Sequence, residues 1–234
     1  MIKYILFDLD GTLLPMEQKP FVKAYFSGLA KKLAPLGYEP NLVIDAVVRG
    51  VGAMTNNDGR ETNEIVFWNN FAEILGEEVR KHQELFENYY KKEFQELKNV
   101  CGFEPMAKEV IGLVKEKGFK VALATSPVFP RIATESRIRW AGLELDDFEI
   151  VTTYEDYSYA KPNLRYYKEV LLQLNVKPEE CVMIGNDVQE DMIASELGMK
   201  TFLLTNCLIN RTQQDISEFA QGGFLELVEF IKNL

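Results

Sequence analysis

The chain contains 234 residues, 47% of them hydrophobic, which is enough for one large domain or for a core domain carrying a smaller insert. Its formal net charge is −10 and its sequence pI is about 4.8, with acidic and basic residues intermixed and no basic run, so we do not expect nucleic acid as a partner. The three cysteines lie far apart and the single histidine stands in a charged stretch, which argues against a disulfide framework, a zinc site and histidine catalysis.

The first predicted element is a strand from Tyr4 to Leu9, a short run of large apolar residues. The segment is apolar for only a few residues before two carboxylates interrupt it, so we expect neither a signal peptide nor a membrane span. We therefore expect a cytoplasmic protein that does not bind membranes.

From Pro15 to Cys101 the sequence shows helical periodicity and no convincing strand. The expected helices run from Pro20 to Leu36, from Asn41 to Val48, from Asn63 to Leu75 and from Glu77 to Leu97. This pattern predicts an all-helical domain, residues 15–101, inserted after the first strand. The segment from Asn99 to Pro105 contains glycine and proline and suits a hinge, so we expect a mobile cap over the strand ends.

Residues 1–14 and 102–234 are expected to form one core domain in which strands and helices alternate. Its later strands are predicted at Lys120 to Ala124, Phe148 to Thr152, Cys181 to Gly185 and Lys200 to Leu204. Its helices are predicted at Met106 to Lys117, Arg131 to Ala141, Leu164 to Gln173 and Asp191 to Leu197. Repeated strand, helix, strand units imply an α/β fold with a doubly wound, Rossmann-like parallel sheet. A last helix from Asp215 is interrupted by Gly222 and Gly223, which form either a turn or a short edge strand.

Ligands of such sheets sit beyond the carboxyl ends of the strands. Asp8 and Asp10 end the first strand, where alternation places both on the same side, and Gly11 lets the chain turn close to a ligand. Like charges this close repel unless a cation neutralises them, which makes the pair a candidate metal site and a candidate pair of nucleophile and acid. Taken alone, an ordinary acidic turn explains the pattern equally well.

Three later strand ends carry polar groups that suit the same chemistry. Thr125 and Ser126 follow the second strand and offer hydroxyl and amide groups to phosphate oxygens. Lys161 precedes a helix and can reach a phosphoryl group, although a surface lysine before a proline is the simpler interpretation. Asp187 and Asp191 lie one helical turn apart and can face the same crevice, whereas Asp187 alone could be an N-cap.

Together, these four elements resemble the signature of the haloacid dehalogenase-like (HAD) hydrolase superfamily. The motif from Asp8 to Leu13 is complete and highly specific, and the motif from Gly185 to Asp191 is moderately specific. The threonine and lysine motifs are specific only by position. The resemblance covers nearly the whole chain. An all-helical insert between the first two motifs resembles the cap of subclass I, which includes phosphoglycolate phosphatases, β-phosphoglucomutases and haloacid dehalogenases.

The resemblance implies that Asp8 attacks phosphorus while Asp10 protonates the leaving oxygen and later activates water. It also implies Mg²⁺ as the cofactor. The ion would be held by the carboxylates of Asp8 and Asp187 and by the backbone carbonyl of Asp10.

The phosphate-binding roles implied by the resemblance fall to Lys161, Thr125 and Ser126. Asp191 would either support the metal or orient Lys161. The core motifs touch only phosphate and metal, so the substrate is expected to be a small phosphorylated metabolite that the cap selects.

A Mg²⁺-dependent phosphatase is therefore the expected function. A phosphomutase of the β-phosphoglucomutase type shares all four motifs and stays open. A haloacid dehalogenase does not need Asp10, and a receiver-type signalling domain has a different motif order and no cap. A catalytically silent binding protein is disfavoured by four intact motifs.

Polar residues between two helices of the predicted cap are candidates for substrate contact, although a solvated loop explains them more simply: Arg49, Asn56, Asn57 and Arg60. The aromatic residues of the cap recur at helical spacing and are expected to form its core rather than a platform for a base: Phe67, Trp68, Phe71, Tyr89 and Tyr90. The sequence does not distinguish a monomer from a homodimer.

Overall fold

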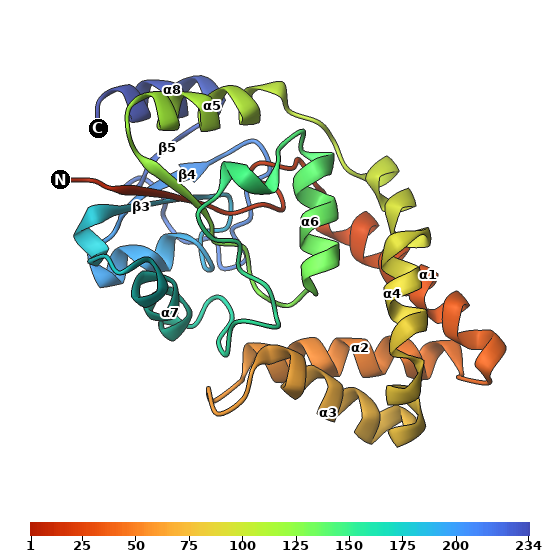
Figure 1. The fold of residues 1–234 in the computed structure, drawn as a ribbon. Helices are drawn as coiled ribbons and strands as arrows, with labels where there is room; N and C mark the ends of the chain where they lie inside the picture. Colours follow the sequence, from red (N-terminus) through yellow and green to blue (C-terminus); the bar gives the residue numbers. More distant parts are fainter.

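The computed structural model describes residues 1–234 and shows a parallel sheet with helices on both faces, from which a helical segment extends to one side (Figure 1). The five strands lie in the order β2-β1-β3-β4-β5. In chain order they span Tyr4–Phe7 (β1), Lys120–Leu123 (β2), Cys181–Gly185 (β3), Lys200–Leu204 (β4) and Ala220–Gly222 (β5). The predicted α/β fold with a Rossmann-like parallel sheet is thus confirmed.

Strand β1 lies between β2 and β3, and both of its faces are covered. Ile5 and Phe7 belong to the apolar cluster that contains α5 (Pro105–Glu116) and α8 (Phe224–Lys232). Leu6 points to the other face and packs with α7 (Leu164–Leu174). Tyr4 is level with Lys120 of β2 and Cys181 of β3, so the carboxyl ends of the three strands reach the same edge of the sheet.

The predicted strand at Phe148 to Thr152 is wrong as a regular strand. This segment runs along the outer edge of β2 and forms one isolated bridge, between Leu123 and Val151. Its pairing stops at Thr152, whose hydroxyl donates to the carbonyl of Thr125 at 2.5 Å instead of continuing along the sheet edge. It follows the short 3-10 helix η4 (Leu145–Asp147).

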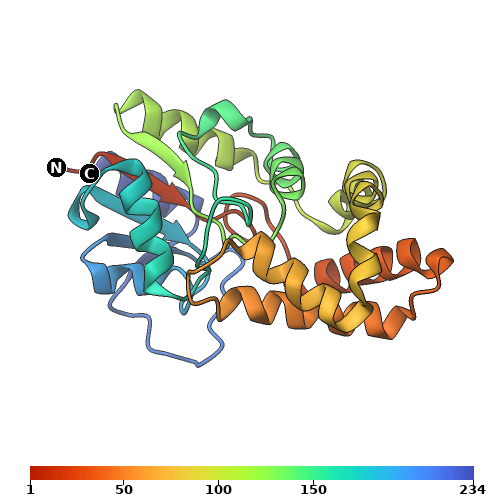
Figure 2. The same cartoon turned by 60° about the horizontal axis from the view of Figure 1, so that its bottom comes forward.

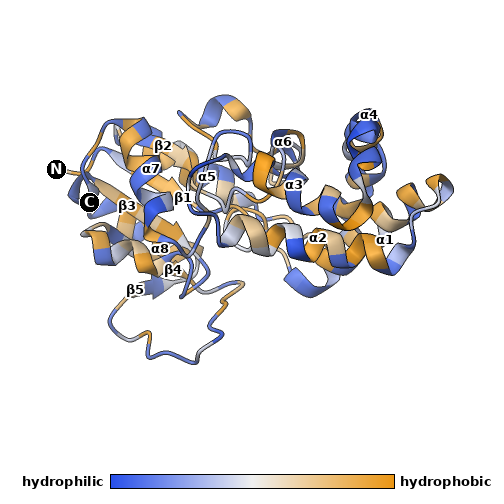
Figure 3. Ribbon diagram, turned by 90° about the horizontal axis from the view of Figure 1, so that it is seen from below, coloured by the Kyte–Doolittle hydropathy of each residue, from blue (hydrophilic) through white to orange (hydrophobic).

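The other elements of the sheet region lie close to their predicted places. Helix α6 spans Arg131–Trp140, and the segment after β3 is the 3-10 helix η6 (Met192–Leu197) rather than an α-helix. A further 3-10 turn, η5, spans Pro178–Glu180. Residues 215–219 form turns rather than the start of the last predicted helix, Gly222 ends the edge strand β5, and the helix expected after the two glycines is confirmed as α8. In Figure 3 the strands are mostly hydrophobic, whereas the long loop between β4 and β5 is mostly hydrophilic.

Between β1 and β2 the chain forms α-helices and 3-10 helices, which we call the helical segment. In order they are α1 (Gln18–Leu33), η1 (Ala34–Leu36), α2 (Pro40–Thr55), α3 (Asn63–Leu75), η2 (Glu77–His82), α4 (Gln83–Lys91) and η3 (Glu93–Val100). Helices α2 and α3 lie side by side (Figure 2). None of the helices in the structure is long and apolar enough to cross a bilayer. The division into a core domain and a cap domain stays a prediction.

Two helices of this segment differ from their predicted extents. Helix α2 continues beyond Val48 to Thr55, and its Gly50 lets the Phe67 ring of α3 approach so closely that a β-carbon would lie 2.6 Å from it. The helix predicted at Glu77 to Leu97 is divided into η2, α4 and η3. Its second break lies at Lys92, where the backbone leaves helical geometry (φ −121°, ψ −82°).

The break at Lys92 brings η3 against α6. The ring of Phe94 stacks on Trp140 with centroids 5.2 Å apart, and the Gln95 amide donates to the Ser136 hydroxyl at 2.9 Å. One apolar cluster consequently runs from the sheet through α6 into the helical segment.

Two chain connections join the helical segment to the sheet region, and they are bonded to each other. Met16 and Cys101 form an antiparallel bridge, and the amide of Gly102 donates to the carbonyl of Pro15 at 2.7 Å. On the far side, the start of α3 contacts the loops after β2. Asn63 is fully buried there, and its side-chain amide donates to the Pro127 carbonyl at 3.1 Å.

Candidate active site

The ends of β1, β2 and β3 open into a cavity of about 510 Å³ that the helical segment covers. Asp8 continues β1 by one residue, since its amide donates to the Ile184 carbonyl of β3 at 2.9 Å. The polar residues predicted from the strand ends all line this cavity: Asp8, Asp10, Thr125, Ser126, Lys161, Asp187 and Asp191. The structure therefore brings together side chains that are up to 183 positions apart in the sequence.

Lys161 links two of these carboxylates. Its ammonium donates to Asp8 Oδ1 at 3.0 Å and to Asp191 Oδ1 at 2.6 Å, and the lysine side chain is almost fully buried. Burial alone would lower the pKa of Lys161, but the carboxylates of Asp191 and Asp8 outweigh it and hold this pKa above its ordinary value. Lys161 is therefore a fixed positive charge beside Asp8.

Asp191 is held from two sides. Its Oδ1 accepts from Lys161, and its Oδ2 accepts from the backbone amide of Asp187 at 2.9 Å. Gly185 leaves the space for this carboxylate, because a β-carbon there would lie 2.1 Å from Asp191 Oδ2. Of the two roles expected for Asp191, the hydrogen bond to Lys161 is the one that has a contact in the structure.

Asp10 forms an ion pair with Arg137 of α6, a residue that sequence reasoning missed. The Arg137 side chain is completely buried, lies 4.2 Å from the centre of the Phe129 ring and also donates to Thr134 Oγ1 at 3.2 Å. Burial raises the pKa of Asp10 to about 6, although Arg137 acts in the opposite direction.

A signal for Arg137 exists in the sequence. Arg137 follows Ala133 by four positions and precedes Trp140 by three, so it lies on the apolar face of α6. An arginine on a buried face needs an acidic partner, and that requirement distinguishes it from its exposed neighbour Arg139.

Thr12 and Gly11 fix the turn that carries Asp10. The Thr12 hydroxyl lies 3.0 Å from Asn186 Oδ1 and 3.3 Å from Asp8 Oδ2. Gly11 has φ +89°, and a β-carbon there would lie 2.4 Å from the Asn186 amide. Only glycine suits both the backbone angle and the close approach.

The oxygen donors at this edge fit a hard cation such as Mg²⁺. Asp187 Oδ1 accepts from the amides of Gln189 and Glu190, whereas its Oδ2 is buried and accepts no hydrogen bond, although a guanidinium nitrogen of Arg211 lies 2.6 Å away. No three acidic, histidine or cysteine side chains converge on one point. The donor set that the resemblance implies, two carboxylates and a backbone carbonyl, consists of oxygens alone and suits such a cation.

The polar candidates of the helical segment do not reach the cavity. Arg49 lies on the outer face of α2 and pairs with Asp45 at 2.9 Å. Arg60 is 86% exposed and pairs with Asp58. Asn56 is exposed, and the buried Asn57 uses its side chain within its own loop, where it donates to Asn63 Oδ1 at 2.9 Å.

Aromatic residues of the helical segment take two places. Phe71 and Tyr89 are fully buried in the apolar cluster, as predicted for a core. Phe67, Trp68 and Tyr90 line the cavity. Part of the expected core is therefore also the wall that faces the strand ends.

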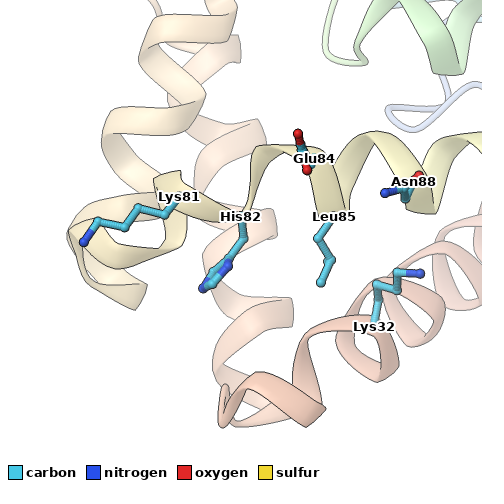
Figure 4. Close-up of a pocket in the computed structure, with 6 residues that line it drawn as sticks. All are labelled: Lys32, Lys81, His82, Glu84, Leu85 and Asn88. Carbon is cyan, nitrogen blue, oxygen red and sulfur yellow. The ribbon is translucent and has the colours of Figure 1, made fainter.

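A second hollow lies on the outside of the helical segment, between α1 and the start of α4 (Figure 4). Its six lining residues are Lys32, Lys81, His82, Glu84, Leu85 and Asn88. Lys32 and Lys81 are paired with Glu93 and Glu78, and no lining residue is shared with the cavity at the strand ends. The histidine thus stands at the surface, as its charged surroundings predict.

Known proteins resemble this chain over almost its whole length. The glyceraldehyde 3-phosphate phosphatase of Methanocaldococcus jannaschii is 27% identical, with 100% of this chain and 99% of that protein covered. A HAD phosphatase from Thermococcus onnurineus has a TM-score of 0.61 at 22% identity, with 98% of both chains covered. A 2-haloacid dehalogenase from Pseudomonas syringae has a TM-score of 0.66 at 18% identity, with 100% of this chain and 99% of that chain covered. The model of the haloacid dehalogenase-like hydrolase family matches residues 2–198, and the chain therefore belongs to this family of hydrolases.

Proposed function

We propose that this hydrolase is a Mg²⁺-dependent phosphatase that cleaves a small phosphomonoester through an aspartyl-phosphate on Asp8. The observation that carries the proposal is the position of Asp8, next to the fixed charge of Lys161 and two residues from Asp10 in the cavity at the strand ends. The likeness to a glyceraldehyde 3-phosphate phosphatase over the full chain supports it.

In the first step, an oxygen of the Asp8 carboxylate attacks phosphorus, and the bond between phosphorus and the ester oxygen breaks. Asp10 gives its proton to the departing oxygen, and the alcohol leaves. The raised pKa of Asp10, about 6, keeps a protonated fraction available near neutral pH. Lys161 neutralises charge that develops on the phosphoryl oxygens.

In the second step, water attacks phosphorus and Asp10 accepts its proton. The bond between phosphorus and Asp8 breaks, so phosphate leaves and the Asp8 carboxylate is restored. Asp10 is then protonated again for the next cycle. The ion pair with Arg137 holds the Asp10 carboxylate in one orientation.

Thr125 and Ser126 would bind the other phosphoryl oxygens. The carbonyl of Thr125 accepts from Thr152 Oγ1 at 2.5 Å and from the Tyr166 hydroxyl at 2.9 Å. These bonds fix the loop from its rear, so its hydroxyl and amide groups are held in place before the substrate binds.

Asp8, Asp187 and the carbonyl of Asp10 would hold Mg²⁺. The ion would offset the repulsion between clustered carboxylates and a phosphate dianion. Asp187 Oδ2 is buried, accepts no hydrogen bond and is paired with the charge of Arg211, and it is the oxygen that this assignment would give to the ion.

Turnover of p-nitrophenyl phosphate with Mg²⁺ tests the proposal. We expect many turnovers per chain, and we expect Asp8→Asn to lower kcat by at least about 1,000-fold because the nucleophile is lost. A single stable phosphoryl group per chain would instead indicate a signalling domain. Full activity of Asp8→Asn would contradict the mechanism.

A further inference from the structure

The two halves of the cavity wall differ in charge. Every charged lining residue comes from the sheet region rather than from the helical segment: Asp8, Asp10, Lys161, Asp187, Glu190 and Asp191. Every lining side chain from α1, α2, α3 and α4 is uncharged, and most are apolar. The end of the cavity that receives the phosphate is therefore ionic, and the end that receives the rest of the substrate is not.

The polar atoms of the uncharged half are largely engaged with the protein itself. The hydroxyls of Tyr25 and Tyr90 lie 2.8 Å apart and bond to each other. The Thr55 hydroxyl donates to the Val51 carbonyl of its own helix at 3.0 Å. Gln18 is exposed at the mouth. Few groups thus remain to bind the hydroxyls of a sugar.

Exposed apolar side chains mark the opening of the same half. Val48 on α2 is 50% exposed and Val22 on α1 is 39% exposed, and both line the cavity. Deeper in, the wall is formed by rings such as those of Phe21, Phe67 and Trp68. A ligand with an apolar body would cover this surface and remove it from water.

We propose that the substrate is a phosphomonoester whose organic part is uncharged and mainly apolar, such as an alkyl or aryl phosphate. This inference rests on the phosphatase function proposed above. The organic part lies among α1, α2 and α3 while the phosphate meets Lys161 and Asp8. The cavity, at about 510 Å³, is within the range of about 300–1,000 Å³ that holds small organic ligands.

Carboxylated and highly hydroxylated substrates are disfavoured by the same wall. A carboxylate carried into the uncharged half would find no cation, because Arg49 and Arg60 lie outside the cavity and pair with their own aspartates. A buried group that loses water without gaining a partner weakens binding strongly. An enzyme rejects a substrate that leaves a buried polar group unpaired more strongly than a substrate that only lacks a methylene group.

A matched pair of esters tests the substrate class. Hexyl phosphate and 6-(phosphonooxy)hexanoate share the same primary ester and chain, and they differ in a charge at the far end. We expect kcat/KM to favour hexyl phosphate by at least about 100-fold. Equal rates, or a preference for the carboxylate, would overturn the inference.

Val48→Lys tests the wall itself, because it places a cation at the exposed rim. We expect the ratio of kcat/KM for hexyl phosphate to kcat/KM for the carboxylate to fall by about fivefold, which is the effect of one exposed ion pair. Leu42→Lys is the matched control, since Leu42 is also exposed on α2 but does not line the cavity, and we expect no change. An unchanged preference in Val48→Lys would count against the proposed position of the organic group.

These assays distinguish a failure of the phosphatase function from a failure of the proposed substrate class. If neither ester nor p-nitrophenyl phosphate is turned over, the phosphatase function fails and the substrate class fails with it. If phosphate is released from all three but the apolar ester is not preferred, only the substrate class is wrong.

Discussion

The buried guanidinium of Arg137 is the positioning group on which the orientation of Asp10 depends. It contacts the Asp10 carboxylate, the Thr134 hydroxyl and the Phe129 ring, so its own position is fixed on three sides. We infer that this ionic contact orients the proposed acid.

Removal of that contact should impair catalysis more than binding. We expect Arg137→Met to lower kcat by about 100-fold with little change in KM, because the proposed acid loses its orientation. Arg137→Lys should restore part of kcat, since it returns the charge. Arg139→Met, on the exposed face of the same helix, is the control. Wild-type kcat in Arg137→Met would show that Asp10 needs no such support.

Gly185 offers a second test at the residue scale, because a single added methyl group would meet Asp191. We expect Gly185→Ala to displace Asp191, to loosen Lys161 and to lower the free energy of unfolding by about 1–3 kcal/mol, because the new methyl has no room. Urea unfolding and phosphatase assays measure the two effects. Gly112 lies in the middle of α5, where a β-carbon would meet no other atom. Gly112→Ala should therefore raise the free energy of unfolding by about 0.5–1 kcal/mol. If Gly185→Ala matches that control, the close packing around Asp191 is not required.

Most of the predicted site residues came together because strand ends place them, whereas Lys161 lies in the irregular segment just before α7. Asp8, Thr125 and Asp187 follow apolar runs that the sequence displays directly, and parallel strands end at one edge. Arg137 and Arg211 were not predicted, because their contacts depend on how α6 and the loop after β4 pack in space. The spacing of Arg137 places it on the apolar face of α6, but no local pattern records which carboxylate it meets.

Among the elements, η3 fastens the helical segment to α6. Phe94 is fully buried, stacks on Trp140 and also meets Phe21 edge-on at 6.3 Å. This contact follows from the break at Lys92, which the helical periodicity of the sequence conceals.

Loss of the Phe94 ring should destabilise the folded protein. We expect Phe94→Ala to lower the free energy of unfolding by about 3–5 kcal/mol, because it leaves a cavity between η3 and α6. Leu172→Ala, at an exposed position on α7, should change it by less than about 0.5 kcal/mol. Urea unfolding compares the two variants. A small effect in Phe94→Ala would mean that the two surfaces close up around the missing ring.

Element boundaries show where sequence patterns stop being informative. The apolar runs of β1, β3 and β4 are continuous and were located within one or two residues. Phe148 to Thr152 has a similar composition but lies at the sheet edge, where one bridge replaces a ladder. Helix α2 continues through Gly50, where the Phe67 ring of α3 leaves no room for a β-carbon, so this glycine marks a contact between helices rather than a helix end.

At the scale of the whole molecule, acidic side chains outnumber basic ones around the cavity, which predicts that activity depends on a divalent cation. We expect chelation to abolish phosphatase activity, and Mg²⁺ at 100 times its Kd to stabilise the folded protein by about 2.7 kcal/mol. Thermal unfolding with and without Mg²⁺ measures the second effect. Asp187→Asn should lose this shift, whereas Asp215→Asn, at an exposed position, should keep it. The same shift in both variants would place the ion elsewhere.

The bonded pair of connections at Met16 and Cys101 has a consequence for how the cavity exchanges its contents. Two strands that are hydrogen-bonded side by side resist twisting about their length more than a single chain does, while they still bend across it. Opposite this ribbon, the start of α3 is bonded to the loops after β2 by the Asn63 side chain and by backbone hydrogen bonds. The packing of η3 on α6 is a further attachment. If the helical segment moves during a catalytic cycle, the paired connections would restrict it to bending, so that the same uncharged wall would face Asp8 each time the cavity closes.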